Sequence, residues 1–287
     1  ARTTGELGFI KQKQSIQRRA RCIRQKWGKM RKSKVLHKVR AGQGVRICGL
    51  GHYLPFFVRY AAESGYDAVW LDLEHRAMDQ REIQALLALC RASDIDCMVR
   101  APTLERTRLY RYLEDGAAGL MMPLVSDASL ARQIVEAVKY PPMGNRGLDG
   151  AGLDGDFGLD VWHEGSTYID DANRETFVVL QIETPDALAN VDEIAAVDGV
   201  DGLFVGPADL GLRLGLAGGD VDIDQAIDKV AAAAQKHGKA WGIPASTPDA
   251  LADYRARGAQ LLAYGGDFAL AKVLADCGRD FDRAFGE

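Results

Sequence analysis

The chain has 287 residues, of which 47% are hydrophobic and 26% are charged, and its formal net charge is -4. This composition is typical of a globular protein with enough chain to bury a full-sized core. No apolar run approaches the ~20 residues that a membrane span needs, which excludes a transmembrane protein.

The cysteines are odd in number and scattered along the chain, and no C-x-x-C pair occurs. They are Cys22, Cys48, Cys90, Cys97 and Cys277. This usage favours reduced thiols in a cytoplasmic protein over a disulfide framework.

The first 40 residues form a strongly basic segment. They carry fourteen Lys or Arg and one acid, Glu6, so the segment is +13 and the remaining 247 residues are -17. Its hydrophobic residues are sparse, and we therefore predict that residues 1–34 are a basic extension outside the main fold. A transit peptide, a basic helix packed on an acidic oligomer surface, and residues upstream of the true start are the alternatives.

Residues 35–287 are predicted to form one domain in which short apolar runs alternate with helical periods. The runs are 45–51, 68–75, 96–102, 119–125, 176–184, 200–207, 239–245 and 260–266. They lack strict in–out alternation, which is typical of strands buried on both faces. Apolar residues recur at helical spacing in 79–94 and 127–140. Eight strand–helix units predict an α/β protein of the (β/α)8 TIM-barrel class.

One connection, residues 141–158, contains six glycines and is predicted to be neither helix nor strand. A loop of this length in a barrel is usually functional, although a plain surface loop is the alternative. Asp149, Asp154 and Asp156 are expected to be solvated loop residues. Arg146 is either a salt-bridge anchor for the loop or a binder of a substrate carboxylate.

Polar side chains gather where four neighbouring strands end, which is where barrels of this class carry their reactive groups. They are Asp72, Glu74, His75, Arg100, Gln181, Glu183 and the run Gly206-Pro207-Ala208-Asp209. Charged groups at the ends of apolar strands are costly unless they are paired or bind a metal. His52, after the first strand, is expected to be a structural hydrogen-bonding residue, with a position facing the site as the alternative.

Glu183 and Asp209 lie on adjacent predicted strands and suit a hard divalent cation. Two carboxylate ligands leave positions for water and a chelating substrate, which favours Mg²⁺ or Mn²⁺, with Co²⁺ as a further metal. No lysine lies at the carboxyl end of a predicted strand, which excludes a Schiff-base mechanism. No G-x-S-x-G, Walker or G-x-G-x-x-G motif occurs, which disfavours a serine nucleophile and a nucleotide cofactor.

These residues resemble the HpcH/HpaI class of metal-dependent pyruvate aldolases over about residues 35–285. The matching segments are DLEH at 72–75, VRAP at 99–102, GAAGLMMPLV at 116–125, KYPPMGNRG at 139–147, QIET at 181–184, VDGLFVGPADL at 200–210 and YGGD at 264–267.

The resemblance implies aldol cleavage of a 4-hydroxy-2-oxo acid into pyruvate, or a close 2-oxo acid, and an aldehyde. Glu183 and Asp209 would hold the metal, with Asp72 and Glu74 nearby, and Arg100 would neutralise the enolate oxygen. His75 would be the general base. The pyruvate carboxylate would meet backbone N–H groups around Ala208 and Asp209, with Gln181, Gly206 and Pro207 lining the same site.

Two departures from the family pattern stand out. The acidic partner that the resemblance implies for His75, before strand four, is here Glu114 rather than Asp. The segment after the Gly-Arg-Gly turn differs from the family's, so the aldehyde cannot be inferred. The resemblance also implies a homo-oligomer, a hexamer of dimers that exchange a last helix over about residues 268–285.

Two alternatives stay open. A related enzyme could combine the same enolate with another electrophile, as in citrate-type condensation with acetyl-CoA, or could decarboxylate oxaloacetate. A non-catalytic barrel with a basic arm for an acidic partner is an alternative of another class. The acidic body disfavours nucleic acid.

Overall fold

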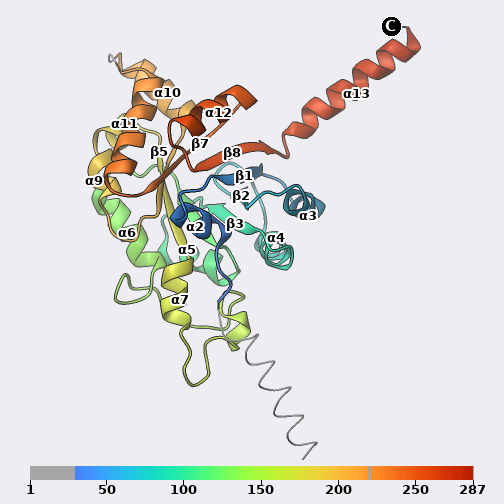
Figure 1. Ribbon diagram of the computed structural model, residues 1–287. Coiled ribbons are helices and arrows are strands. Elements are labelled where there is room, and N and C mark those ends of the chain that lie inside the picture. Colours follow the sequence, from blue (N-terminus) through green and yellow to red (C-terminus); the bar gives the residue numbers. More distant parts are fainter. Residues whose placement is uncertain (1–29, 219–220, 287) are drawn as a thin grey trace, which may run out of the picture.

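The computed structural model describes residues 30–218 and 221–286, which form a closed barrel of eight parallel strands (Figure 1). The strands are β1 (Val45–Leu50), β2 (Ala68–Asp72), β3 (Asp96–Arg100), β4 (Gly119–Met122), β5 (Phe177–Ile182), β6 (Gly202–Val205), β7 (Ala240–Pro244) and β8 (Leu261–Gly266). Each strand pairs with its neighbour in sequence, and β8 closes the barrel on β1 with Val45 opposite Leu261. All eight predicted strands are present, and the predicted TIM barrel is confirmed.

Helices α3 to α12 connect consecutive strands and cover the outside of the barrel, while α2 precedes β1 and α13 follows β8 (Figure 1). They are α2 (Lys34–Arg40), α3 (Pro55–Glu63), α4 (Gln80–Ala92), α5 (Arg106–Glu114), α6 (Ala128–Val138), α7 (Tyr168–Glu175), α8 (Pro185–Ala189), α9 (Val191–Ala195), α10 (Pro207–Ala217), α11 (Ile223–Lys236), α12 (Pro248–Ala256) and α13 (Ala269–Phe285). Thr184 and Thr247 cap α8 and α12, since their hydroxyls accept from the backbone N–H of Ala187 and Ala250. Each cap precedes a first-turn proline, whose missing N–H is not needed there.

Two hydrophobic layers hold the barrel together. One lies between the strands and the outer helices, and the other fills the barrel interior with side chains such as Met98, Phe177 and Phe204. Strands β3, β5 and β6 are buried on both faces along their whole length, which explains why their sequences lack alternation. Gly119 faces Phe177 across the β4–β5 ladder, where an added Cβ would lie 2.2 Å from the ring.

Helix α2 closes the end of the barrel where the strands begin. Val35 and Leu36 pack against the interior side chains. The buried carboxylate of Asp96, at the start of β3, accepts hydrogen bonds from Ser33 Oγ (2.7 Å) and from the N–H of Val35 (3.0 Å). Residues 30–34 of the predicted extension therefore pack on the barrel, whereas residues 1–29 lie outside the described part of the chain.

Helix α13 follows β8 and projects away from the barrel (Figure 1). None of its residues is buried, although Leu270, Val273, Leu274, Phe281 and Phe285 are large apolar side chains. Among the described residues, no helix combines the length and the apolarity needed to span a bilayer.

Candidate active site

Asp72 and Arg100, at the ends of β2 and β3, form a bidentate ion pair. Arg100 donates from Nε to Asp72 Oδ1 (2.9 Å) and from Nη2 to Asp72 Oδ2 (2.8 Å). Burial alone would raise the pKa of Asp72, but the hydrogen bonds and the charge of Arg100 outweigh it and lower that pKa. Asp72 is therefore ionised and holds the guanidinium in one orientation.

The same carboxylate shapes the turn that carries Glu74 and His75. Asp72 Oδ1 also accepts from the backbone N–H of Glu74 (3.1 Å) and of His75 (3.3 Å), and so β2 ends three residues earlier than predicted. Glu74 Oε2 lies 3.2 Å from Arg100 Nη1 and 3.6 Å from His75 Nε2. The His75 side chain is 54% exposed. These four predicted residues are thus brought together at the carboxyl end of the barrel.

Trp70 lies beside this cluster and was not singled out in the sequence. The guanidinium of Arg100 lies 4.9 Å from the centroid of the Trp70 ring, and the indole forms a T-shaped pair with Phe204 at 5.5 Å between ring centroids. The indole N–H is buried without a hydrogen-bond acceptor among the described residues. Trp70 therefore supports Arg100 from the barrel interior by a cation–π contact.

Glu183 follows β5 and is buried in the barrel mouth. Its Oε1 accepts from the backbone N–H of Leu124 (2.7 Å). Burial raises the pKa of Glu183, and the negative charges of Glu74 and Asp209 raise it further, against the opposing effect of the Leu124 N–H. Glu74, Asp209 and Glu183 therefore lie close enough for the charges of the first two to act on the third.

Gly206 makes room for this arrangement. It is the residue before α10, and an added Cβ would lie 2.8 Å from both Cβ and Oε2 of Glu183 and 3.2 Å from Gln181 Nε2. Its φ of -94° is accessible to any residue, so glycine is required here for space and not for conformation. Gln181 and Gly206, both predicted site residues, thus contact one another beside Glu183.

Asp209 lies in the first turn of α10, which begins with Pro207 and Ala208. Its side chain is 45% exposed and lies 3.3 Å from Arg213 Nη2, while Arg213 Nη1 donates to the Glu183 carbonyl (3.3 Å). The first backbone N–H groups of a helix point outward and favour an anion. Arg213 was not predicted from the sequence and is an added cation at this end of the barrel.

These oxygen atoms fit a hard divalent cation. Gln181 Oε1 is buried and accepts no hydrogen bond from the described residues, and the pKa of Glu183 is raised in part by neighbouring carboxylates. A cation would relieve both. No three His, Cys, Asp or Glu side chains within the described ranges are close enough to hold a metal by themselves. Glu183 and Asp209 would therefore need water and substrate oxygens to complete the coordination.

Among the described residues, no ion pair joins Glu114 to His75, whose charged partner is Glu74, whereas Glu114 pairs with Arg111. Glu114 is the last residue of α5, and a helix of a barrel ends beside the start of the next strand, opposite the mouth. Burial raises the pKa of Glu114, and its charged neighbours are Arg146, Arg111, Asp154 and Asp149.

Arg146 is an anchor of the glycine-rich segment and does not lie in the barrel mouth. Its side chain is 1% exposed, Nη2 donates to Asp154 Oδ2 (2.6 Å), and the guanidinium lies 4.6 Å from the centroid of the Tyr140 ring. Tyr168 donates to the same oxygen of Asp154 (2.7 Å). The expectation that Asp154 is solvated is therefore wrong, and the substrate-binding alternative for Arg146 is contradicted.

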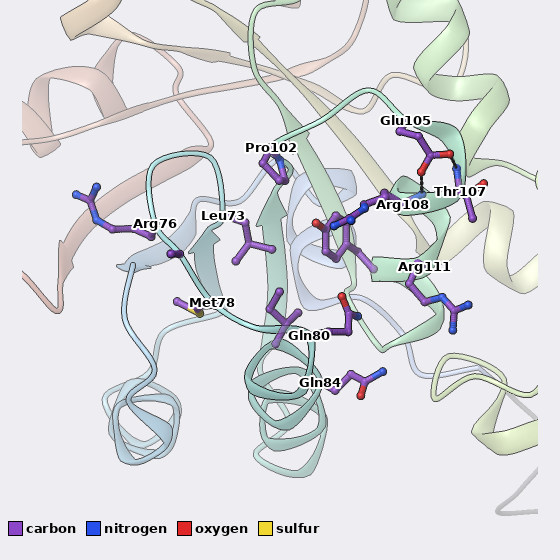
Figure 2. A pocket seen from close by; sticks show the side chains of 13 residues that line it. Leu73, Arg76, Met78, Gln80, Gln84, Pro102, Glu105, Thr107, Arg108 and Arg111 are labelled. Carbon is purple, nitrogen blue, oxygen red and sulfur yellow. Dashed lines mark hydrogen bonds between the residues drawn. The ribbon is translucent and has the colours of Figure 1, made fainter.

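A cavity of about 530 Å³ lies on the flank of the barrel between α4 and α5 (Figure 2). Arg108, Arg111, Tyr112, Gln80 and Gln84 line it. None of the predicted catalytic or metal-binding residues lines this cavity, and the candidate site is the barrel mouth.

Comparison with known proteins agrees with the geometry. The family described as HpcH/HpaI aldolase/citrate lyase matches residues 53–272. The hydroxypyruvate/pyruvate aldolase of Roseovarius nubinhibens is 36% identical over 78% of this chain and 86% of its own length. The 4-hydroxy-2-oxovalerate aldolase of Rhodococcus jostii is 35% identical over 76% of this chain and 85% of its own.

Solved structures show the same relationship. The HpcH/HpaI aldolase from Desulfitobacterium hafniense superposes with a TM-score of 0.78 at 33% identity, over 85% of this chain and 95% of that one. The match of the family description to most of the chain, the identity to its members and the shared barrel agree. The chain belongs to the HpcH/HpaI aldolase/citrate lyase family.

Proposed function

We propose that the protein is a metal-dependent pyruvate aldolase, a carbon–carbon lyase that cleaves a 4-hydroxy-2-oxo acid into pyruvate and an aldehyde. The observation that carries the proposal is the arrangement of Arg100, His75 and Glu74 beside Glu183 and Asp209 at one end of the barrel. The names of relatives at about 35% identity support the same reaction class.

Glu183 and Asp209 would hold the divalent cation, Mg²⁺ or Mn²⁺, because the surrounding donors are oxygen atoms. When bound, the cation supplies the electrophile that makes the carbon next to the 2-oxo group acidic. Among the described residues, no lysine replaces it. Lys139 donates to the carbonyls of Asn173 and Thr176, and Lys239 to those of Val197 and Val200.

Arg100 neutralises the negative charge that develops on the 2-oxo oxygen. Asp72 binds Nε and Nη2 of Arg100, so Nη1 is the nitrogen that faces Glu74 and the remainder of the site. A donor that is already oriented needs little reorganisation as charge develops. The pyruvate carboxylate binds at the start of α10, against the N–H groups of Ala208 and Asp209.

His75 moves the proton. In cleavage its imidazole takes the proton of the 4-hydroxyl group, and in synthesis it helps to remove a proton from the pyruvate methyl group. The nearest charged partner of His75 is Glu74, at 3.6 Å between Nε2 and Oε2. Glu74 is therefore the acid that would orient this imidazole within the chain.

The assembly belongs to the same proposal. A groove of about 730 Å³ lies between β1, β8 and α12, lined by apolar side chains such as Leu251, Leu262 and Tyr66. It lies where the helix after β8 would pack on its own barrel, whereas α13 extends outward (Figure 1). We infer that α13 of a second copy fills it, within a hexamer of such dimers in the cytoplasm.

The test of the proposed reaction is exchange of the pyruvate methyl protons in D₂O, followed by NMR. The metal-stripped protein is compared with protein given Mn²⁺ or Mg²⁺, and with Glu183→Ala and the surface control Glu136→Ala. We expect metal-dependent exchange that falls at least about a hundredfold in Glu183→Ala only. Exchange at the same rate with and without metal, or no exchange with either metal, contradicts the proposal. A requirement for acetyl-CoA would identify the condensing relative instead.

A further inference from the structure

Arg213 bridges the two residues to which the proposed function assigns the metal. It lies in α10, one turn after Asp209, and its Nη2 is 3.3 Å from Asp209 Oδ1. Its Nη1 donates to the backbone carbonyl of Glu183, also at 3.3 Å. Among the described residues, no other cation pairs with Asp209. Two nitrogens of one planar group thus join the first turn of α10 to the end of β5.

Each of the two carboxylates has one oxygen engaged. Glu183 Oε1 accepts from the backbone N–H of Leu124 (2.7 Å). Glu183 Oε2 lies beside Gly206, where an added Cβ would be 2.8 Å from it, and Gly206 directly precedes α10. Arg213 contacts Asp209 through Oδ1, which leaves Oδ2 for a ligand. The arrangement therefore offers a cation one oxygen from each carboxylate, Glu183 Oε2 and Asp209 Oδ2.

We propose that Arg213 is a positioning residue that keeps Asp209 a monodentate ligand, and that the site thereby selects Mg²⁺ over Ca²⁺. The inference rests on the proposed function, in which Glu183 and Asp209 hold the cation. A carboxylate ligand is fixed in orientation by the outer group that hydrogen-bonds it. Mg²⁺ requires near-ideal octahedral geometry, whereas Ca²⁺ accepts more ligands and bidentate carboxylates. Without Arg213, Asp209 is free to turn and to offer both oxygens, which favours Ca²⁺.

The charge of Arg213 has a different effect from its geometry. Removing a guanidinium near the site strengthens the attraction for every divalent cation by a similar factor, because the Coulomb energy depends on charge and distance. The ratio of the Mg²⁺ and Ca²⁺ affinities is then unchanged. A change in this ratio therefore reports the orientation of Asp209 and not the loss of a positive charge.

The test measures Mn²⁺ binding by electron paramagnetic resonance titration, and Mg²⁺ and Ca²⁺ binding by displacement of the Mn²⁺. The wild type is compared with Arg213→Ala and Arg213→Lys. Arg59→Ala is the matched control, because Arg59 forms the same type of i,i+4 pair, with Glu63 on the exposed face of α3. We expect Arg213→Ala to lose about ten- to a hundredfold of the preference for Mg²⁺ over Ca²⁺, and Arg59→Ala to keep it.

Arg213→Lys keeps the charge, but its single nitrogen cannot hold the carboxylate and the Glu183 carbonyl in the same fixed geometry. It should lose about three- to tenfold of the preference. An unchanged ratio in Arg213→Ala overturns the inference, and so does an equal loss in Arg59→Ala. A wild type that binds no Mn²⁺ overturns the proposed metal site and the inference with it. Mn²⁺ binding by the wild type with a ratio that Arg213→Ala leaves unaltered is failure of the inference alone.

Discussion

Gly206 is the residue on which the carboxylate site depends through its lack of a side chain. The Cβ of Gly206→Ala would meet Glu183 at 2.8 Å, so Glu183 has to move out of the position in which it faces Asp209. We expect at least a tenfold loss of Mn²⁺ affinity, measured by electron paramagnetic resonance titration. Gly211→Ala, five residues later within α10 and with nothing within 4 Å of its Cβ, should bind Mn²⁺ normally. Equal affinities would show that Glu183 is no ligand.

Glu183 is held at the expense of stability. Its pKa is raised in the fold, mainly by burial, so the unfolding free energy falls as pH rises above the ordinary glutamate pKa of about 4.3. The penalty is absent at lower pH and complete once pH exceeds the raised value. Metal-free Glu183→Gln should therefore melt higher than the wild type at pH 8, by about 2–4 °C per kcal/mol.

Thermal melts at pH 4 and pH 8 test this sign. The gain should vanish at pH 4, and Glu136→Gln, on an exposed face of α6, should change neither melt. Added Mn²⁺ should raise the melting temperature of the wild type more than that of Glu183→Gln. A variant that is less stable than the wild type at pH 8 without metal would contradict the account.

The polar residues of the mouth could be predicted because a charged group at the end of an apolar strand is costly unless it is paired or binds a ligand. The role of Trp70 could not be predicted, because an aromatic residue inside a strand looks in the sequence like an ordinary core residue. Only the structure shows that its ring lies under Arg100.

At the scale of elements, the glycine-rich segment is held by one buried ion pair. The side chains of Arg146 and Asp154 are 1% and 4% exposed, and removing one partner of such a pair leaves an uncompensated charge. Arg146→Ala should lower the unfolding free energy by about 3–5 kcal/mol, measured by urea denaturation. Asp149→Ala, an exposed change in the same segment, should cost less than about 1 kcal/mol. Equal losses would mean that the pair does not anchor the segment.

The order of strands and helices could be read from the sequence because the two periodicities are distinct and the caps are local. The position of Glu114 could also have been read from it. The helix that follows β3 returns to the start of β4, so its last residue lies away from the mouth. The backbone path of residues 144–158 could not be predicted from the sequence. It depends on contacts of Asp154 with Arg146 and Tyr168 that form only in the folded chain.

At the scale of the whole molecule, α13 carries an apolar face that its own barrel does not cover. Leu274 and Phe281 are 70% and 62% exposed, which is unfavourable in water unless a partner buries them. Light scattering after gel filtration should give the mass of an oligomer for the wild type and a smaller mass for the double variant Leu274→Asp/Phe281→Asp.

The polar face of the same helix provides the control. Lys272 pairs with Asp276 there, and Lys272→Asp introduces an acidic side chain without touching the apolar stripe. It should leave the mass unchanged. A wild-type protein that elutes as a monomer would contradict the exchanged-helix assembly, and a double variant that keeps the full mass would show that α13 does not form the interface.

The ribosome makes β1 long before β8, the strand with which β1 pairs to close the barrel. Val45 of β1 cannot pair until Leu261 of β8 has been synthesised. The backbone N–H of Gly51 likewise donates to Asp267 Oδ2, which lies 216 positions later in the chain. At 5–20 residues per second, a ribosome needs roughly 10–40 s to make that stretch. Throughout this interval the outer edge of β1 has unpaired N–H and carbonyl groups, the kind of surface on which chains aggregate. Slow elongation near the end of the message should therefore lower the yield of folded protein more than the same delay at its start.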